Sequence, residues 1–411
     1  MRPALRLDTA PGQATLVGEC LLALLHEPPR VADLPYLDEG QSDQLVRAAY
    51  SHGVAAMVHD ALAQADQLPK LAPPARQAMA KLRLDAAARH LLTSADLHKL
   101  ATALGSANVP WAVMKGPAVA YLGYRDPTVR WSCDLDVLVS ASAFGPALDA
   151  LIAAGATLHG LDWHHLLSLS LSEAGVELPL GTILDLHWHP VNNRQARSTT
   201  SLDIDAVLSR RRLVPNDAGL PLHALCPVDN MIFVALHASL AGGHRLLWAK
   251  DIERLARHDP PDWDELERRA FAYHVALPVG IMLRRAARLL GAEVPPDTVR
   301  ALMGGRREAG LWSLAERLAR PGSLARNKHT GTAFICSLTG THRGTAVALT
   351  RTLVRPRLAK LGVPPHGKRG VGSTTSLPRS TGEAAAREAY LSVICADKRS
   401  QLTPGVHPRP L

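Results

Sequence analysis

Aromatic residues and paired cysteines are scarce in this 411-residue chain, and long apolar runs are missing. Aromatics make up 4% of the residues, so Leu, Ala and Val must form most of the core. The five cysteines include no CxxC pair, and an odd, scattered set argues against a disulfide framework or a zinc knuckle. No uninterrupted apolar stretch approaches the roughly 20 residues of a transmembrane helix. These absences predict a soluble, cytoplasmic protein with no membrane partner.

Excess positive charge is missing from most of the chain, although the formal net charge is +9. Residues 321–411 hold 14 Lys and Arg against 3 Asp and Glu, whereas residues 1–320 hold 32 against 34. An extended phosphate track needs many cationic contacts, which the near-neutral body does not supply. Nucleic acid is therefore a disfavoured partner. It would require the basic tail to act as an RNA-binding arm, and a solvated, disordered tail is the simpler interpretation.

Four stretches differ in their hydrophobic rhythm, and there is no internal repeat. Apolar residues at three- and four-residue spacings predict an N-terminal helical region over 1–107 and a C-terminal one over 201–320. Between them, 108–200 alternates short β-like runs with helical ones, which indicates an α+β core. Residues 321–411 are rich in Gly, Pro, Ser and basic residues, which predicts a largely disordered tail. Within it, 382–399 has the composition of one isolated or docking helix.

An acidic pair stands on a predicted strand of the core, in the run SCDLDVLVS. Side chains alternate along a strand, so Asp134 and Asp136 share one face while Leu135 and Val137 pack behind them. Two neighbouring carboxylates repel each other unless a cation compensates, and a divalent metal with oxygen preference does so. The pair predicts a metal site; an exposed acidic strand edge or a pair of turn aspartates is the alternative.

A third carboxylate lies on the predicted strand TILDLHWH, where Ile183, Asp185, His187 and His189 share a face. An aspartate in an otherwise apolar strand is unfavourable unless it is paired or bound to metal. Asp185 is therefore a candidate to complete a carboxylate triad. The His-x-His pair also has metal-ligand spacing, which keeps a zinc site open as an alternative, although no cysteine or acidic pattern supports zinc.

A loop that ends in Lys115 and Gly116 precedes the acidic strand. Glycine lets the backbone come close to an anion, so this loop is a candidate phosphate contact, with an ordinary turn as the alternative. Arg125 and Arg130 follow it, and their guanidinium groups could clamp phosphate oxygens or form surface ion pairs.

Together these motifs resemble the uncharacterised bacterial nucleotidyltransferase family of the polymerase-β-like superfamily. Its members carry a Lys-Gly loop, a Y-x-D-P-x-x-R stretch, a D-x-D strand and a D-L-H-W strand, here residues 115–116, 124–130, 134–136 and 185–188. The run WAKDIERL, with Trp248 and Asp251, is similar to a downstream family motif. Two departures are Pro117 after the loop, which removes a backbone donor, and the bulky Trp131 before the acidic strand.

The resemblance implies a nucleotidyltransferase fold, a small mixed sheet flanked by the two helical regions. It implies transfer of a nucleoside monophosphate from a nucleoside triphosphate to a hydroxyl-bearing acceptor, with ATP and hence AMP expected on abundance. It also implies Mg²⁺ or Mn²⁺ in a two-metal mechanism. The metal-binding and catalytic residues would be Asp134, Asp136 and Asp185. The nucleotide-binding residues would be Lys115, Gly116 and Arg130.

The acceptor stays open among a small molecule, a peptide, a protein hydroxyl and RNA. We expect acceptor contacts from polar side chains on the third-carboxylate strand and the downstream helices, namely His187, His237, His244, Arg245 and Asp251. The alternative function is a catalytically silent module that binds nucleotide or protein, such as the antitoxin-like partner of a toxin.

Overall fold

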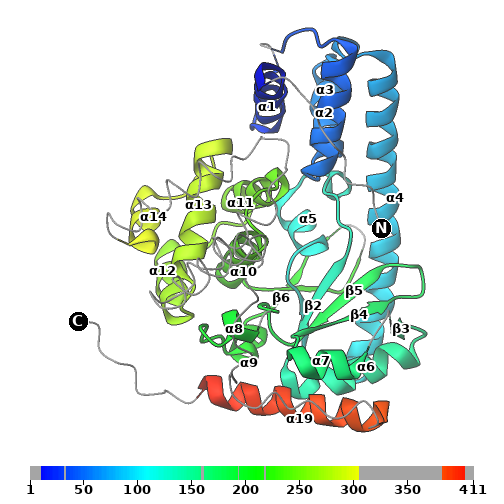
Figure 1. Ribbon diagram of the computed structural model, residues 1–411, viewed down its shortest axis with the longest axis vertical. Coiled ribbons are helices and arrows are strands. Elements are labelled where there is room, and N and C mark those ends of the chain that lie inside the picture. The colour runs from blue at the N-terminus through cyan, green and yellow to red at the C-terminus, as the bar shows by residue number, and fades with distance from the viewer. Residues whose placement is uncertain are drawn as a thin grey trace, which may run out of the picture.

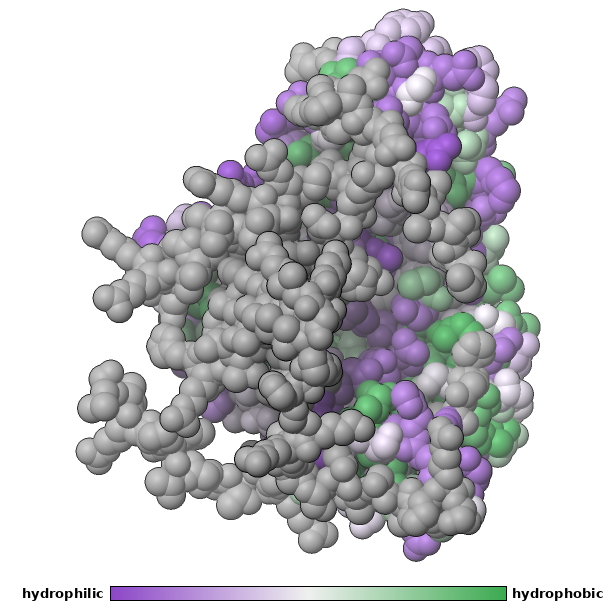
Figure 2. All heavy atoms as spheres, in the orientation of Figure 1, coloured by the Kyte–Doolittle hydropathy of each residue, from purple (hydrophilic) through white to green (hydrophobic). Residues whose placement is uncertain are grey.

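The computed structural model describes residues 11–31, 34–158, 162–192, 194–216, 219–304 and 382–402. A mixed sheet stands between an N-terminal and a C-terminal group of helices (Figure 1), which confirms the predicted α+β class. The N-terminal group consists of α1 (Pro11–Leu25), α2 (Glu39–Ser51), α3 (Ala55–Gln64), the 3₁₀ turn η1 (Leu68–Lys70) and α4 (Pro73–Ser106). In the view of Figure 2, the described atoms at the top of the molecule, over these helices, are mostly hydrophilic.

The sheet has seven strands in the order β3-β4-β5-β2-β1-β7-β6. Their bounds are β1 (Trp111–Val113), β2 (Leu135–Val139), β3 (Thr157–Leu158), β4 (Glu173–Glu177), β5 (Ile183–His187), β6 (Arg212–Val214) and β7 (Leu222–Ala224). The central strand β2 pairs antiparallel with β1 and parallel with β5. As predicted, β4 and β5 form a hairpin that turns at Gly181, whose φ of +84° favours glycine.

Alternation along the central strands divides the apolar side chains between two cores. Leu135, Val137 and Val139 of β2 belong to a core that also contains the second half of α4. Leu138 points the other way, into a core shared with the N-terminal and C-terminal helices. Asp136 has the same parity as Leu138. The strand therefore directs the Asp136 carboxylate toward the helices of the second core.

Short helices connect the strands of the core. They are α5 (Pro117–Gly123), the 3₁₀ turns η2 (Pro127–Val129) and η3 (Ala141–Ala143), α6 (Phe144–Ala153), α7 (Trp163–Leu169), α8 (Arg194–Arg197) and α9 (Ile204–Ser209). The helix α5 starts at Pro117, whose fixed φ suits a first helical position. Its last residue, Gly123, lies against α11, where an added Cβ would come within 2.9 Å of Arg254 Cβ.

The C-terminal group is helical as expected, with two differences. It contains α10 (Pro227–Leu240), α11 (Leu246–His258), α12 (Trp263–Ala272), α13 (Ala276–Leu290) and α14 (Pro296–Met303). The short strands β6 and β7 precede it within the stretch predicted to be helical, and β7 extends the sheet beside β1. The run after Trp263 was expected as one helix, but it breaks at His274, which adopts a φ of +59°. A left-handed residue cannot continue an α-helix.

Within the predicted tail, α19 (Glu383–Leu402) is a helix that docks against the sheet domain, along α7 and η3 (Figure 1). Its side chains Ala386, Tyr390 and Ile394 are fully buried at four-residue spacing. This is the docking helix left open by the sequence, not an isolated one. The disorder expected for residues 321–381 falls outside the described residues. Among the described helices, none is long and apolar enough to cross a membrane.

Candidate active site

Two aspartates lie side by side on the parallel strands β2 and β5. Asp136 and Asp185 are register partners, so their side chains project from the same face of the sheet. His187 follows two positions after Asp185 and shares that face. Asp136, Asp185 and His187 each offer a ligand atom, and these atoms lie within 4.8 Å of one another. Two of the three predicted carboxylates and His187 thus form one cluster, named the carboxylate group.

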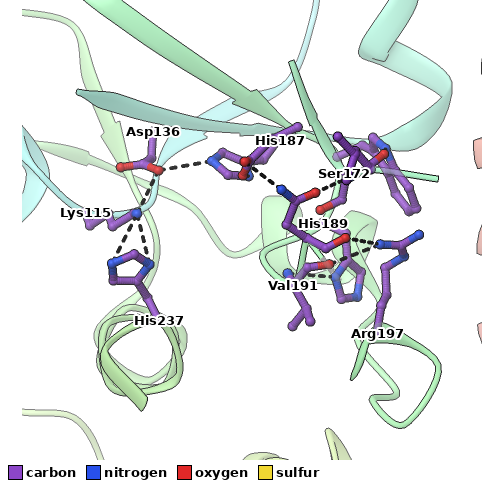
Figure 3. A network of polar contacts seen from close by, with 12 residues as sticks. Lys115, Asp136, Ser172, His187, His189, Val191, Arg197 and His237 are labelled. Carbon is purple, nitrogen blue, oxygen red and sulfur yellow. Dashed lines mark hydrogen bonds and ion pairs between the residues drawn. The ribbon is translucent and has the colours of Figure 1, made fainter. Parts of the chain in front are cut away.

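Asp136 is the buried centre of this group, with 2% of its side chain exposed. Its Oδ1 accepts from Lys115 Nζ at 2.8 Å and from His187 Nε2 at 3.0 Å (Figure 3). Burial alone would raise the pKa of Asp136, but Lys115 and His187 hold it well below its ordinary value. Asp136 is therefore an anion held between two hydrogen-bond donors.

Lys115 connects the strand to the C-terminal helices. It follows β1, and its Nζ donates to His237 Nδ1 on α10 at 3.0 Å (Figure 3). Burial would lower the pKa of Lys115, but Asp136 and Asp134 raise it overall. Burial and the Lys115 charge lower the pKa of His237 to about 3. This imidazole is therefore neutral and accepts a hydrogen bond from the Lys115 ammonium group.

Asp185 differs from Asp136 because no cation among the described residues is bonded to it. Burial and the Asp136 charge raise the pKa of Asp185 to about 6. Its register partner therefore holds the negative charge in the metal-free state, while Asp185 holds a proton more readily. Two carboxylates with different pKa values on one face can play different chemical roles.

His187 is oriented by residues that the sequence did not single out. Its Nδ1 lies 3.4 Å from Oε2 of Glu173, the register partner of His187 on β4. Glu173 Oε1 in turn accepts from Asn192 Nδ2 at 2.6 Å, and Asn192 Oδ1 accepts from the Ser172 backbone N–H. Burial would lower the pKa of His187, but the hydrogen bond to Asp136 raises it. The hairpin register set by the Gly181 turn was the available signal for Glu173.

The donor set fits a divalent cation. Asp136 Oδ2 is buried and has no hydrogen-bond partner among the described residues, so one carboxylate oxygen is left for a further ligand. Two carboxylates suit Mg²⁺ or Mn²⁺, and an imidazole nitrogen is also a ligand for Mn²⁺ or Zn²⁺. His189 lies outside this group: it is fully buried, and its Nδ1 accepts from the Val191 N–H. The second histidine of the suggested zinc pair therefore faces elsewhere.

Asp134 lies one residue before β2 begins and is partly buried. Its charge still raises the pKa of Lys115 and of Asp185, so it lies near the group. It is not one of the three residues whose ligand atoms converge within 4.8 Å. The alternation argument assumed that the strand already included Asp134, whereas the structure places that residue in a bend.

The Lys-Gly loop continues β1 and runs beside the acidic strand β2. The Met114 N–H donates to the Asp136 carbonyl, and Gly116 has a φ of +61°, a conformation that favours glycine. An added Cβ at Gly116 would lie 3.4 Å from Ser132 Oγ. The loop therefore brings its backbone close to the edge of the carboxylate group.

Arg130 and Asp251 bind each other. Arg130 Nε and Nη2 donate to the two oxygens of Asp251 at 3.0 and 2.7 Å, and the Tyr124 hydroxyl donates to the same carboxylate at 2.8 Å. Arg130 Nη1 donates to Ser132 Oγ at 2.7 Å, beside Gly116. The first and last residues of the Y-x-D-P-x-x-R stretch thus meet on the aspartate of the WAKDIERL run. The buried Arg130 guanidinium group is therefore bound to Asp251 and is not open to solvent.

The other predicted acceptor residues gather around Trp248 on α11. His237 and His244 face its ring edge-on at 5.7 and 5.1 Å between centroids, and the Arg245 guanidinium lies 5.7 Å from the ring centroid. Because His237 also bonds Lys115, this cluster continues from the carboxylate group onto the helices. Asp251 faces Arg130 and is not part of the cluster.

Comparison with known proteins agrees with this geometry. The description "Uncharacterised nucleotidyltransferase" belongs to the family that matches residues 38–291, which is more than half of the chain. The matched range contains the sheet, the carboxylate group, the Lys-Gly loop and the Arg130–Asp251 pair. No curated protein and no solved structure matches the chain. The chain belongs to the family of uncharacterised nucleotidyltransferases.

Proposed function

We propose that the chain transfers a nucleoside monophosphate from a nucleoside triphosphate to a hydroxyl group of an acceptor, by the chemistry of the polymerase-β-like superfamily. The observation that carries the proposal is the pair Asp136 and Asp185, in register on parallel strands beside Lys115. In the reaction the acceptor oxygen bonds to the α-phosphorus. The bond between the α-phosphorus and the oxygen that bridges it to the β-phosphorus breaks, and pyrophosphate leaves. ATP is the first nucleotide to test.

Asp136, Asp185 and His187 would hold Mg²⁺ or Mn²⁺, and Asp134 at the entrance to the strand would be a further ligand. A bound ion there supplies charge neutralisation for the triphosphate and orients its oxygens. The raised pKa of Asp185 suits a base that takes the proton of the acceptor hydroxyl, because a pKa close to neutrality favours both uptake and release.

Lys115 and the Gly116 backbone would contact the phosphates, since both lie at the edge of the carboxylate group. Arg130 would act by positioning, because its fork is bound to Asp251 while Nη1 holds Ser132 next to that loop. The Trp248 cluster, with His237, His244 and Arg245, would form the wall that faces the acceptor.

A catalytically silent nucleotide-binding module is the second candidate, and one observation favours it. Lys115 and His187 already compensate the Asp136 charge without a metal ion. A site that is neutral by itself has less need of metal than a bare carboxylate pair. In that case nucleotide would bind with no transfer.

Labelled nucleotide decides between the two candidates. The full chain would be incubated with α-labelled and, separately, γ-labelled ATP, Mg²⁺ or Mn²⁺, and extract of its own producing cells, and then with the other triphosphates. The proposal expects label from the α position, and none from the γ position, on a third molecule. Asp136→Asn should abolish this transfer, whereas Asp43→Asn, an exposed aspartate on α2, should not. Saturable binding of nucleotide without any transfer would establish the silent module instead.

A further inference from the structure

A cavity of about 680 Å³ lies apart from the carboxylate group. It is enclosed by the end of α1, by α3, by α11 and by the turn from α5 to η2, which meet in the upper half of Figure 1. None of Lys115, Asp136, Asp185 or His187 lines it. Its volume is within the range of small-molecule sites. The proposed transfer reaction leaves this cavity without a role.

Two buried cations form the base of the cavity. Lys250 and Arg254 lie one turn apart on α11, with 7% and 9% of their side chains exposed. Arg257, from the next turn of α11, and Arg125, from the turn after α5, add two further guanidinium groups to the lining. Arg125 is exposed and makes no hydrogen bond or ion pair within the described part of the chain.

The acidic partner of Arg254 comes from the turn that follows α1. Glu27 Oε2 lies 2.6 Å from Arg254 Nη1 and 3.9 Å from Lys250 Nζ. Glu27 remains 40% exposed, although Arg254 is buried. Lys250 is paired on its own helix instead, because its Nζ lies 2.7 Å from Oε2 of the fully buried Glu253, which also pairs with Arg257. The two other acids of the lining, Asp60 and Asp126, are both bound by Arg83. Glu27 is thus the exposed carboxylate that pairs with the buried Arg254 guanidinium.

The two histidines of the lining lie near cations of the cavity. Burial, followed by the charges of Arg30 and Lys250, lowers the pKa of His26. Burial, followed by the charge of Arg254, also lowers the pKa of His258. Both histidines line the cavity, and an anion entering it would meet cations on both walls.

The remaining lining is apolar except for Gln64 and the Tyr124 hydroxyl, which donates to Asp251. It comprises side chains from the end of α1, from α3 and from η2, namely Leu24, Leu25, Met57, Ala61 and Val129. An occupant with a single oxyanion group and an apolar body would satisfy both parts of the lining, because guanidinium forks bind carboxylates and phosphates alike.

We propose that this cavity is a second ligand site, which takes a small organic oxyanion with an apolar group in exchange for the Glu27 carboxylate. Glu27 then occupies the position of the ligand: its carboxylate neutralises Arg254 until a ligand carboxylate or phosphate displaces it into solvent. The competing interpretation is that Glu27 is a permanent clamp between the α1 end and α11. The two differ in what removal of the Glu27 charge does to anion binding.

The test measures binding of benzoate and phenyl phosphate to the full chain by calorimetry, with neutral benzamide as the matched control ligand. Glu27→Gln should bind the better anion about ten-fold more tightly than the parent, which is about 1.4 kcal/mol, because the internal competitor has lost its charge. Arg125→Gln should weaken binding. Arg268→Gln is the matched control, since Arg268 is 73% exposed on α12 and does not line the cavity.

The two anions separate a carboxylate from a phosphate ligand, since the tighter of them identifies the head group. Equal affinity of the parent and Glu27→Gln for both anions overturns the exchange and leaves the clamp. Binding of benzamide as tight as that of benzoate, or equal losses in Arg125→Gln and Arg268→Gln, overturns the anion site. If Glu27→Gln does not fold, the comparison of parent, Arg125→Gln and Arg268→Gln still decides whether the cavity binds an anion.

Discussion

The Lys115 ammonium group lies 2.8 Å from Asp136 Oδ1, whereas in the part of the chain that the structure describes no comparable cation is bonded to Asp185. The two carboxylates are register partners on one face of the sheet, yet only one is compensated. The pKa of Asp136 is held low by its donors, whereas burial and Asp136 raise the pKa of Asp185 to about 6. Neutralising each aspartate should therefore change the stability of the metal-free protein in opposite directions.

Asp136→Asn should lower the free energy of unfolding without metal by about 3 kcal/mol, because it leaves Lys115 and His187 buried without their anion. Urea unfolding in the presence of a chelator measures the effect. The double variant Lys115→Met with Asp136→Asn should regain part of the loss. A stability of Asp136→Asn equal to that of the parent would show that the ion pair is not formed in solution.

Asp185→Asn should raise the free energy of unfolding without metal, by about 1–2 kcal/mol at pH 7 after allowance for its partial exposure. The folded-state pKa of about 6 exceeds the ordinary value of 3.8, so the ionised form is disfavoured by folding. That penalty is fully present above pH 6 and is lost as the pH falls from 6 to 3.8. Urea unfolding at pH 7 and at pH 4 tests this, with Asp43→Asn as the exposed control. A gain of equal size at both pH values would contradict the assignment.

Lys115→Met should separate two effects of the lysine. The ammonium group competes with a metal ion for Asp136, so its removal should tighten Mn²⁺ binding, by about ten-fold. The same change should weaken binding of a triphosphate more than of a monophosphate, because the lysine lies at the loop proposed to contact the terminal phosphates. Calorimetry with Mn²⁺ alone and with each nucleotide measures both. Unchanged Mn²⁺ affinity, or equal losses for both nucleotides, would remove Lys115 from the respective role.

His52, which lies outside the carboxylate group, makes the stability of the protein depend on pH. It is 1% exposed between α2 and α3, and its Nδ1 accepts from the Leu246 N–H. Burial, followed by the charges of His244 and Arg245, lowers its pKa to about 4 from the ordinary 6.5. The unfolded chain therefore takes up the proton first, and stability falls as the pH drops from 6.5 towards 4, by up to about 3 kcal/mol from this residue.

His52→Asn keeps an acceptor at the same place and removes the titration. The slope of stability against pH between 4 and 6.5 should become smaller in this variant. His98→Asn, at an exposed position on α4, is the control and should leave the slope unchanged. Equal slopes in all three proteins would show that His52 is not buried as a neutral imidazole.

The sequence predicted the parts of the site that follow from local periodicity. Alternation placed Asp136, and separately Asp185 with His187, on strand faces, and the pairing of β2 with β5 joined them. It did not predict the binding of Arg130 to Asp251, because a contact between residues 121 positions apart leaves no mark on local spacing. Glu173 was missed for a different reason: its place opposite His187 follows from the register of the β4–β5 hairpin, not from the spacing of residues around Glu173.

The sequence left open whether the helix α19 is isolated or docked, because its apolar side chains are few and need a partner surface. Tyr390 is fully buried: its hydroxyl accepts from Trp188 Nε1 at 3.0 Å and donates to the Leu171 carbonyl at 2.8 Å. Asp397 also binds Arg197, whose guanidinium lies 4.6 Å from the Trp188 ring centroid. The helix α19 has no core of its own and packs into the core of the sheet, next to Trp188, which follows the strand β5 that carries His187.

Removal of residues 382–411 should therefore destabilise the protein, in contrast to a dispensable tail. Tyr390→Ala should cost about 4 kcal/mol through the cavity that it leaves, and Tyr390→Phe about 1 kcal/mol, because only hydrogen bonds are lost. Glu388→Ala is the matched control, since Glu388 lies on the exposed side of the same helix. Urea unfolding of the full-length variants measures the series. If Tyr390→Ala and Glu388→Ala unfold at the same urea concentration, α19 is not docked in solution, and the sheet domain is stable without it.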